Sequence, residues 1–347
     1  MASTNVAPRF WTSRSDRQGR KASALSRRTA FALVLLAACL WGTLGTAYHL
    51  LRGVADVDAL TVVTVRASAG AVILCGWLAL TNRGLLRVAA ADLPRLIGFG
   101  VGSLGLMYLS LFIAFDLTSV AVGTVLLYLA PALVTVGAAL FLNEPLTSRK
   151  LIALLLTFGG CLLVVELYRP QNLVGNALGI GSGLVAACAY GFYSLGAKPL
   201  LQRYQAVTVL TYALLSAAVA LLAVKLLTAP GDWPSPSGLL AIGAYGGIVV
   251  TIAPYGLYTL ALRRLPASEA SIVATLEPAV AVVLAGALLG ERLAPLQLLG
   301  TLGILGGVVL LAWPAHAADR ASAAHSIPAA ISGMISWWRH RLAVKLS

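Results

Sequence analysis

The sequence contains few charged residues, few acids in particular, and very little histidine. Of its 347 residues only 11% are charged, with 12 Asp and Glu against 25 Lys and Arg, and there are 4 His. Soluble domains carry about a quarter charged residues. This low charge, together with 59% hydrophobic residues, excludes an ordinary soluble domain and predicts a polytopic membrane protein.

Several kinds of chemical machinery are also missing. The four histidines and four cysteines form no Ser-His-acid or His-Cys cluster at a shared depth, so we predict no catalytic site and no metal. The cysteines lie inside apolar runs and suit packing rather than disulfides. No G-x-x-x-x-G-K-[ST] loop occurs, which argues against a built-in ATP motor. We expect no cofactor and no enzymatic activity.

Apolar runs of about 20 residues, the length that crosses a bilayer core, occur ten times with short connections between them. The segments are 30–51, 59–80, 95–115, 119–141, 150–168, 175–196, 206–227, 238–262, 267–289 and 296–313. The expected fold is an all-α membrane protein with ten transmembrane helices.

The chain repeats itself. Residues 119–164 and 266–311 align without a gap at a constant offset of 147 residues. Internal repetition in an apolar chain is typical of transporters built from two halves around a central site. We assign residues 30–168 to a first five-helix repeat and 175–313 to a second. Because five is an odd number, the second repeat enters the membrane inverted, which favours alternating access.

The basic residues set the orientation. With a cytosolic N-terminus, 20 of the 25 Lys and Arg fall in inner loops and tails, as the positive-inside rule requires. The net charge of +13 therefore points to lipid headgroups and not to nucleic acid. We predict a plasma-membrane protein with both termini cytosolic. Residues 1–29 form a basic cytosolic arm, for which an organellar transit peptide is the alternative, and residues 314–347 form a tail with a basic amphipathic helix on the inner leaflet.

Glycines are spaced as in packed membrane helices, for example Gly243 with Gly247 and Gly303 with Gly307. Residues 100–105 match G-x-G-x-x-G, but that motif needs a soluble βαβ unit to bind a dinucleotide. We interpret it as helix packing.

Two charged residues lie within predicted spans, where a charge costs about 2.5–3.5 kcal/mol and is usually functional or paired. They are Arg66 in the second span and Glu277 in the ninth. Arg66 either binds substrate, snorkels to the headgroups or forms a structural pair. Glu277 either accepts hydrogen bonds from neighbours including Arg66, binds a substrate cation, or takes up a coupling proton. The sequence does not indicate whether the two side chains meet.

Other candidates are prolines and aromatic residues at depth. Pro131 and Pro278 occupy equivalent positions in the two repeats, where each frees a backbone carbonyl and bends its helix, so both are candidate hinges. Aromatic residues with a polar group should point inward to find a partner. Those we assign to a substrate site are Trp41, Tyr108, Tyr128, Tyr190, Tyr193 and Tyr255.

These residues resemble the EamA-type carriers of the drug/metabolite transporter superfamily. The resemblance covers almost all of residues 30–313 and is most specific at Tyr128–Pro131 with Asn143–Leu146, and at Leu276–Pro278 with Leu289–Leu293. It implies two inverted five-helix halves, a central cavity lined by spans one, three, four, six, eight and nine, and export of amino acids, related metabolites or drugs without ATP. Pro145 follows Glu144 where the family usually has a basic residue, and the long N-terminal arm is atypical.

The leading hypothesis is an alternating-access carrier that exports a small metabolite, in the first place an amino acid or similar zwitterion. One alternative is a broad exporter of drugs or lipophilic cations. Another, from a different class, is a non-transporting membrane enzyme or assembly partner. The expected partners are a small-molecule substrate and the lipid bilayer, with the protein a monomer or a homodimer.

Overall fold

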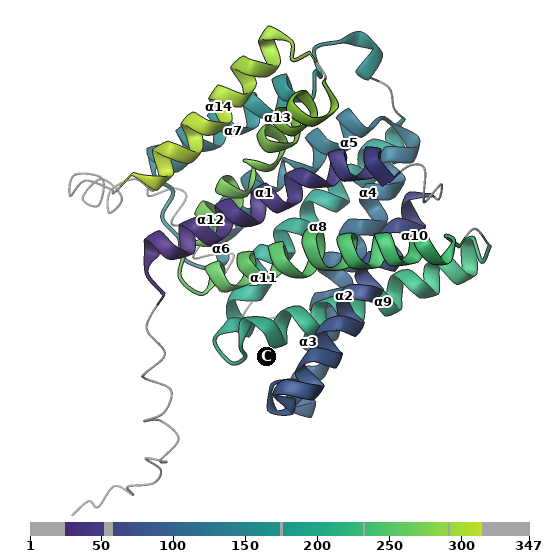
Figure 1. Cartoon of the computed structure of the whole chain (residues 1–347). Helices are drawn as coiled ribbons and strands as arrows, with labels where there is room; N and C mark the ends of the chain where they lie inside the picture. Colours follow the sequence, from purple (N-terminus) through teal and green to yellow (C-terminus); the bar gives the residue numbers. More distant parts are fainter. Residues whose placement is uncertain (1–24, 52–57, 174–175, 232, 291, 314–347) are drawn as a thin grey trace, which may run out of the picture.

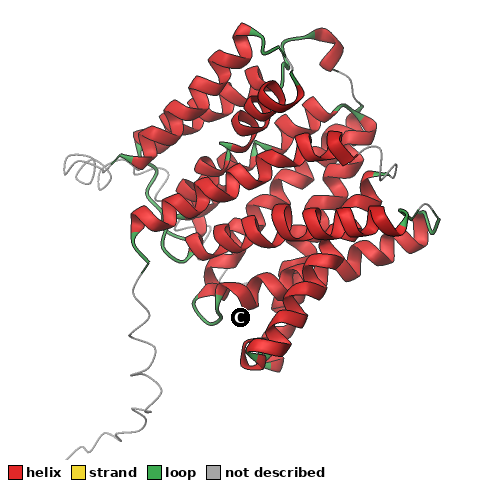
Figure 2. Cartoon of the chain, viewed as in Figure 1, coloured by secondary structure: helices red, strands yellow, loops and turns green. Residues whose placement is uncertain are grey.

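The computed structural model describes residues 25–51, 58–173, 176–231, 233–290 and 292–313. Every regular element in these ranges is a helix, which confirms the predicted all-α fold (Figure 2). The predicted C-terminal tail, Glu291 and most of the N-terminal arm lie outside the described residues. The last three residues of the predicted arm belong to the first helix.

The helices of the two halves follow one another in the same order. The first half contains α1 (Arg27–Leu51), α2 (Ala59–Thr81), α3 (Leu93–Gly100), η5 (Val101–Gly105), α4 (Leu106–Leu117), α5 (Val120–Leu127), α6 (Ala130–Phe141) and α7 (Ser148–Val164). The second contains α8 (Ala177–Leu201), α9 (Ala206–Thr228), α10 (Pro236–Ala241), η7 (Ile242–Ile252), α11 (Ala253–Leu262), α12 (Ala267–Ala274), α13 (Glu277–Leu289) and α14 (Pro295–Ala312). Short 3₁₀ turns in the connections are η3 (Arg83–Leu86), η4 (Ala90–Asp92) and η6 (Pro170–Asn172).

Short polar side chains begin several of these helices. Each accepts a hydrogen bond from a backbone N–H three residues later and so satisfies a donor that the first turn leaves free. The capping residues are Asp58, Ser119, Thr147, Asn176 and Ser235.

These helices make ten units, one for each predicted span. In the described part of the chain, nine of them are long and apolar enough to cross a membrane. The tenth, α7, has 17 residues, at the short end of the range that crosses a bilayer core. It ends at Val164, four residues before the end of its predicted span, and just beyond it Glu166 adopts a left-handed φ of 54°. The sixth unit, α8, continues past its predicted end to Leu201.

The two halves break their helices at equivalent positions. The fourth unit is interrupted between α5 and α6, and the ninth between α12 and α13. The third unit contains the π-helical segment η5, and the eighth contains η7. The helices after these interruptions begin at Ala130 and Glu277 and at Leu106 and Ala253, which are again 147 residues apart.

The packing between halves is also symmetric. Helix α1 packs against α11 and α13, and its counterpart α8 packs against α4 and α6. Helices α2 and α9 pack against each other, as do α7 and α14, which lie side by side along one edge of the bundle (Figure 1). Each contact between a helix of the first half and one of the second is thus matched by a contact between their counterparts. This is the arrangement expected of two inverted repeats.

Glycine makes the closest of these contacts possible. A Cβ at Gly160 of α7 would lie 2.5 Å from the carbonyl oxygen of Gly300 in α14, and one at Gly307 would lie 2.8 Å from the carbonyl of Ala153. Gly100 meets the backbone of Ala213 in α9 in the same way, at 2.7 Å. The G-x-G-x-x-G match therefore begins with a helix-packing glycine.

Candidate functional site

An aromatic cluster fills the middle of the bundle between α1, α8 and α11. The Trp41 ring packs edge-on against Tyr255 with centroids 5.0 Å apart, and Tyr255 lies 5.4 Å from Tyr193. Two hydroxyl pairs join α8 to α11: Tyr193 with Thr259 at 2.5 Å, and Ser194 with Tyr258 at 2.8 Å. These buried contacts hold the two helices together at the ends where Leu201 and Leu262 lie.

A cavity of about 150 Å³ lies against this cluster. Its walls extend toward the end of the bundle where α2 begins and α4 ends, with Ala59, Phe112 and Phe115 among the lining residues. Six of the residues singled out from the sequence also line it: Trp41, Arg66, Tyr108, Tyr190, Tyr255 and Glu277. The cavity therefore has polar groups at its inner end and apolar side chains along its wall.

Arg66 is held in place by helix packing and by an aromatic ring. Gly246 and Gly247 of η7 allow α2 to approach closely, so that a Cβ at Gly246 would lie 3.1 Å from the Arg66 Cβ. The guanidinium lies 4.5 Å from the centre of the Tyr108 ring, within range of a cation–π contact. Among the described residues, none provides a hydrogen-bond partner for the buried Arg66 Nε or the Tyr108 hydroxyl.

Glu277 is the first residue of α13, directly after the helix break. Helix α1 approaches it at Gly42, where a Cβ would lie 2.9 Å from the Glu277 carbonyl oxygen and 2.8 Å from Val280. Arg66 and Glu277 line the same cavity, yet none of the ion pairs found among the described residues joins them. The site thus offers two opposite charges that do not neutralise each other by direct contact.

A second, smaller cavity of about 20 Å³ lies between the two helix breaks. It shares Leu127, Tyr190 and Glu277 with the larger cavity and adds Tyr128, Ser271 and Thr275. Pro131 and Ala274 complete its lining.

The sequence pattern of the EamA-like transporter family matches residues 28–166 and, a second time, residues 177–313. The chain belongs to this family. The two matches follow the two halves of the fold, and together they include all the residues that line both cavities.

Curated relatives of this EamA-family chain include transporters from bacteria and archaea. A protein of Streptantibioticus cattleyicolor described as a probable terminal-alkyne amino-acid exporter is 28% identical over 66% of this chain and 76% of its own length. A transporter of Archaeoglobus fulgidus without an assigned cargo is 29% identical over 81% of this chain and 95% of its own. A solved structure titled "Crystal structure of protein" covers 82% of this chain and 96% of its own with a TM-score of 0.72 and 18% identity, which supports the fold alone.

Tyr193 and Thr275 differ most from what the sequence indicated. Tyr193, expected at the substrate, lines neither of these two cavities and bonds Thr259 within the aromatic cluster. Thr275 lines the small cavity but was not singled out. The repeat could have found it, because Thr275 lies 147 residues after Tyr128.

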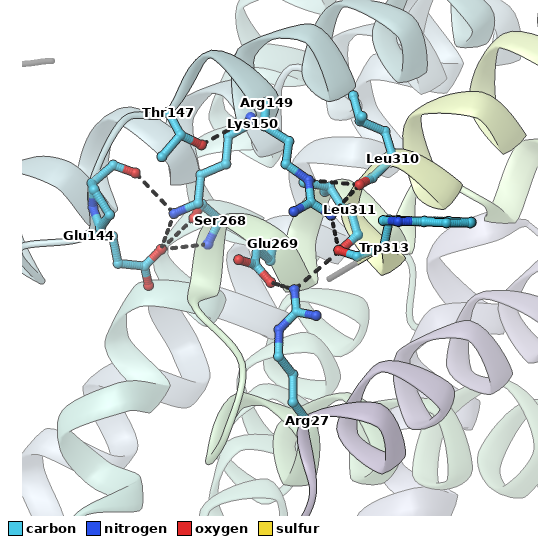
Figure 3. A network of polar contacts seen from close by, with 11 residues as sticks. Arg27, Glu144, Thr147, Arg149, Lys150, Ser268, Glu269, Leu310, Leu311 and Trp313 are labelled. Carbon is cyan, nitrogen blue, oxygen red and sulfur yellow. Dashed lines mark hydrogen bonds and ion pairs between the residues drawn. The ribbon is translucent and has the colours of Figure 1, made fainter. Parts of the chain in front are cut away.

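A polar network joins the helices at the end of the bundle where α12 begins (Figure 3). The Glu144 carboxylate accepts hydrogen bonds from the backbone N–H of Ala267 at 2.6 Å and of Ser268 at 3.2 Å, and from the Ser268 hydroxyl. Lys150 Nζ lies 3.6 Å from the same carboxylate. A cation from the following helix thus lies beside this acid.

Two arginines extend this network in Figure 3. Arg149 of α7 donates from Nε to the carbonyl of Leu310 at 2.8 Å and from Nη2 to that of Trp313. Arg27 of α1 pairs with Glu269 of α12 at 2.7 Å. The contacts join α1, α7, α12 and the end of α14 on one side of the EamA-family bundle.

Proposed function

We propose that this EamA-family protein is an alternating-access carrier that exports a small zwitterion, in the first place an amino acid, across the plasma membrane without ATP hydrolysis. The observation that carries the proposal is the pair of charges in the larger cavity. A zwitterion can place its carboxylate at Arg66 and its ammonium at Glu277, because neither side chain belongs to any of the ion pairs found among the described residues. The name of the Streptantibioticus relative supports the same class of cargo.

The aromatic residues have separate roles in this proposal. Tyr108 fixes the guanidinium by its ring and has a free hydroxyl beside it, so both can contact the carboxylate. Trp41, Tyr190 and Tyr255 line the cavity around the acid and the base. Tyr128 reaches Glu277 from the small cavity. Tyr193 packs against the Tyr255 ring within the aromatic cluster.

Size and charge favour a small zwitterion over a lipophilic cation. Pockets for drug-sized ligands have about 300–1,000 Å³, whereas this cavity has about 150 Å³. A cation without a carboxylate could meet Glu277 but would leave the buried Arg66 charge without a counter-charge. Phe112, Phe115 and Met107 along the wall suit a cargo with an apolar side chain.

The test compares three forms of one apolar amino acid in vesicles that contain the purified protein: the free amino acid, its methyl ester and its N-acetyl derivative. The wild type should prefer the free form. Arg66→Gln should slow the free amino acid about 10–100-fold, the range for losing a charge-assisted hydrogen bond of about 1.5–3 kcal/mol, and should remove the preference over the ester. Arg83→Gln, in the loop after α2, is the matched control. Equal transport of ester and free acid by the wild type would rule out the zwitterion, and transport of a cationic dye instead would favour the drug exporter.

Glu277 has two roles that transport can separate. If Glu277 carries a coupling proton, Glu277→Gln should abolish the dependence of transport on a pH gradient. If Glu277 binds only the cargo amine, the variant should keep its dependence on the pH gradient but lose the preference for the free amine over the N-acetyl form.

The orientation of the protein is tested separately, because reporter tags fused before residue 30 and after residue 313 should both report the cytosol. Tags on opposite faces would contradict the ten-span arrangement.

A further inference from the structure

The small cavity is lined by equivalent residues of the two repeats. Leu127 and Ala274 are equivalent residues of the two halves, and so are Tyr128 and Thr275; all four line the cavity. Pro131 and Pro278 lack the N–H that would bond the carbonyl four residues earlier. Those carbonyls belong to Leu127 and Ala274. The two carbonyls that these prolines cannot bond thus belong to residues that line one small cavity.

Two of the hydroxyls in this cavity, those of Ser271 and Thr275, are acceptors. Ser271 donates its hydrogen to the carbonyl of Ser268 at 3.0 Å, and Thr275 donates to that of Ile272 at 2.6 Å. Each hydroxyl has one hydrogen and two lone pairs, so both oxygens keep lone pairs and have no hydrogen left to offer. Glu277 adds a carboxylate at the same place. A cavity lined by such oxygens attracts a cation or a strong hydrogen-bond donor.

We propose that this cavity binds a single monovalent cation of the Na⁺ class, held by the Glu277 carboxylate, the hydroxyl oxygens of Ser271 and Thr275, and the carbonyls freed by the two prolines. Its volume of about 20 Å³ accommodates about one water-sized particle, so an organic cargo does not fit. Hard cations prefer oxygen ligands, and interrupted membrane helices supply carbonyl oxygens to such ions.

The position of the site links the cation to the cargo. Glu277 and Tyr190 line both cavities, so one carboxylate faces the ion on one side and the cargo on the other. An ion bound at Glu277 would fix the two helix breaks relative to each other and change the charge that a cargo ammonium meets. This coupling depends on the proposed carrier function, whereas cation binding itself does not.

The experiment measures binding of ²²Na⁺ to the purified protein without cargo, at fixed pH and with choline chloride to hold the ionic strength. The wild type should bind one Na⁺ saturably. Ser271→Ala and Thr275→Val should each raise the half-saturating Na⁺ concentration about tenfold or more, the equivalent of about 1.4 kcal/mol, and Glu277→Gln should abolish binding. Thr275→Ser, which keeps the oxygen, should retain binding.

Thr135→Val is the matched control, because Thr135 is a buried threonine of α6 whose hydroxyl donates to its own helix at the carbonyl of Pro131 but does not line the cavity. It should bind Na⁺ like the wild type. Absence of saturable binding by the folded wild type would overturn the proposal, as would equal binding by Glu277→Gln. Na⁺ binding that appears only with an amino acid present would assign these oxygens to the cargo. Because Na⁺ binding is measured without cargo, it can be interpreted even if the purified protein transports no amino acid.

Discussion

Asp58 joins two helices at the end of the bundle toward which the larger cavity extends. Its carboxylate caps α2 by accepting from the Thr61 N–H at 2.8 Å and from the Thr61 hydroxyl at 2.7 Å, and it pairs with Lys225 of α9 at 3.2 Å. The Lys225 side chain is fully buried. Burial opposes ionisation of Asp58, but the hydrogen bonds from Thr61 and Lys225 hold the pKa of its carboxyl below its ordinary value.

We predict that Asp58→Asn lowers the thermal unfolding temperature at neutral pH, because asparagine keeps the cap but leaves the Lys225 ammonium buried without its counter-charge. The folded pKa is depressed, so the contribution is present above the unfolded pKa of about 3.9 and is lost as pH falls through the folded pKa. Unfolding in detergent should therefore show a difference from wild type at pH 7 that shrinks toward pH 3. Asp116→Asn, an exposed acid at the end of α4, is the control. A pH-independent difference would contradict the ion-pair account.

Two residues of the site could be predicted from one physical rule. Charge is costly in a bilayer, and this identified Arg66 and Glu277 from the sequence alone. That they line one cavity could not be predicted, because it depends on how α2 and α13 pack around α1 and α4. Gly247 was expected to pack against a helix, but its contact and that of Gly246 with Arg66 could not be predicted, since glycine is common throughout the chain, with 34 residues.

Among the elements, the helix breaks show where repetition is informative and where it is not. The paired prolines predicted bends in the fourth and ninth spans, and the structure has full interruptions there, with the helix restarting one residue before each proline. The π-helical segments η5 and η7 were not predicted. A π-segment inserts a residue into a helix without a fixed sequence signal, although such segments are frequent at functional sites.

We predict that Pro278→Ala slows transport while cargo binding is retained. Alanine restores an N–H that can bond the carbonyl of Ala274, so the ninth span becomes more continuous and bends less readily. Pro131→Ala should act alike on the fourth span, as the symmetry of the breaks requires. Transport rate and cargo affinity measured on the same vesicles would separate the two effects. Pro295→Ala is the control, because Pro295 begins α14 after an extended residue, so no preceding helix offers a carbonyl that the restored N–H could bond. Unchanged rates in both variants would exclude a hinge.

On the scale of the whole molecule, the two-fold relation of the repeats is nearly complete in backbone and incomplete in side chains. Glu277 has Ala130 as its counterpart, and Tyr128 has Thr275. The repeat in the sequence predicted the symmetric scaffold, because a 147-residue offset fixes equivalent helices. It could not predict toward which end of the bundle the central cavity extends, since two inverted halves give two conformations of similar energy. In this conformation the Glu144 network joins α7 and α12 at one end of the bundle, and the larger cavity extends toward the other end.

We predict that Glu144→Gln shifts the protein toward the conformation open at that end. The neutral side chain weakens the cap on α12 and leaves the buried Lys150 without its counter-charge. About 1–2 kcal/mol lost from one conformation changes a population ratio about 5–30-fold.

A cysteine placed at Phe112 in the wall of the larger cavity should then react several-fold more slowly with a membrane-impermeant thiol reagent added outside. The comparison uses a background without the four native cysteines. Glu269→Gln is the control, because it removes only the partly exposed pair with Arg27, a kind of contact worth at most about 1 kcal/mol. A lower unfolding temperature with unchanged labelling would make Glu144 a folding residue alone. Slower labelling at an unchanged unfolding temperature would show that Glu144 stabilises this conformation relative to the other.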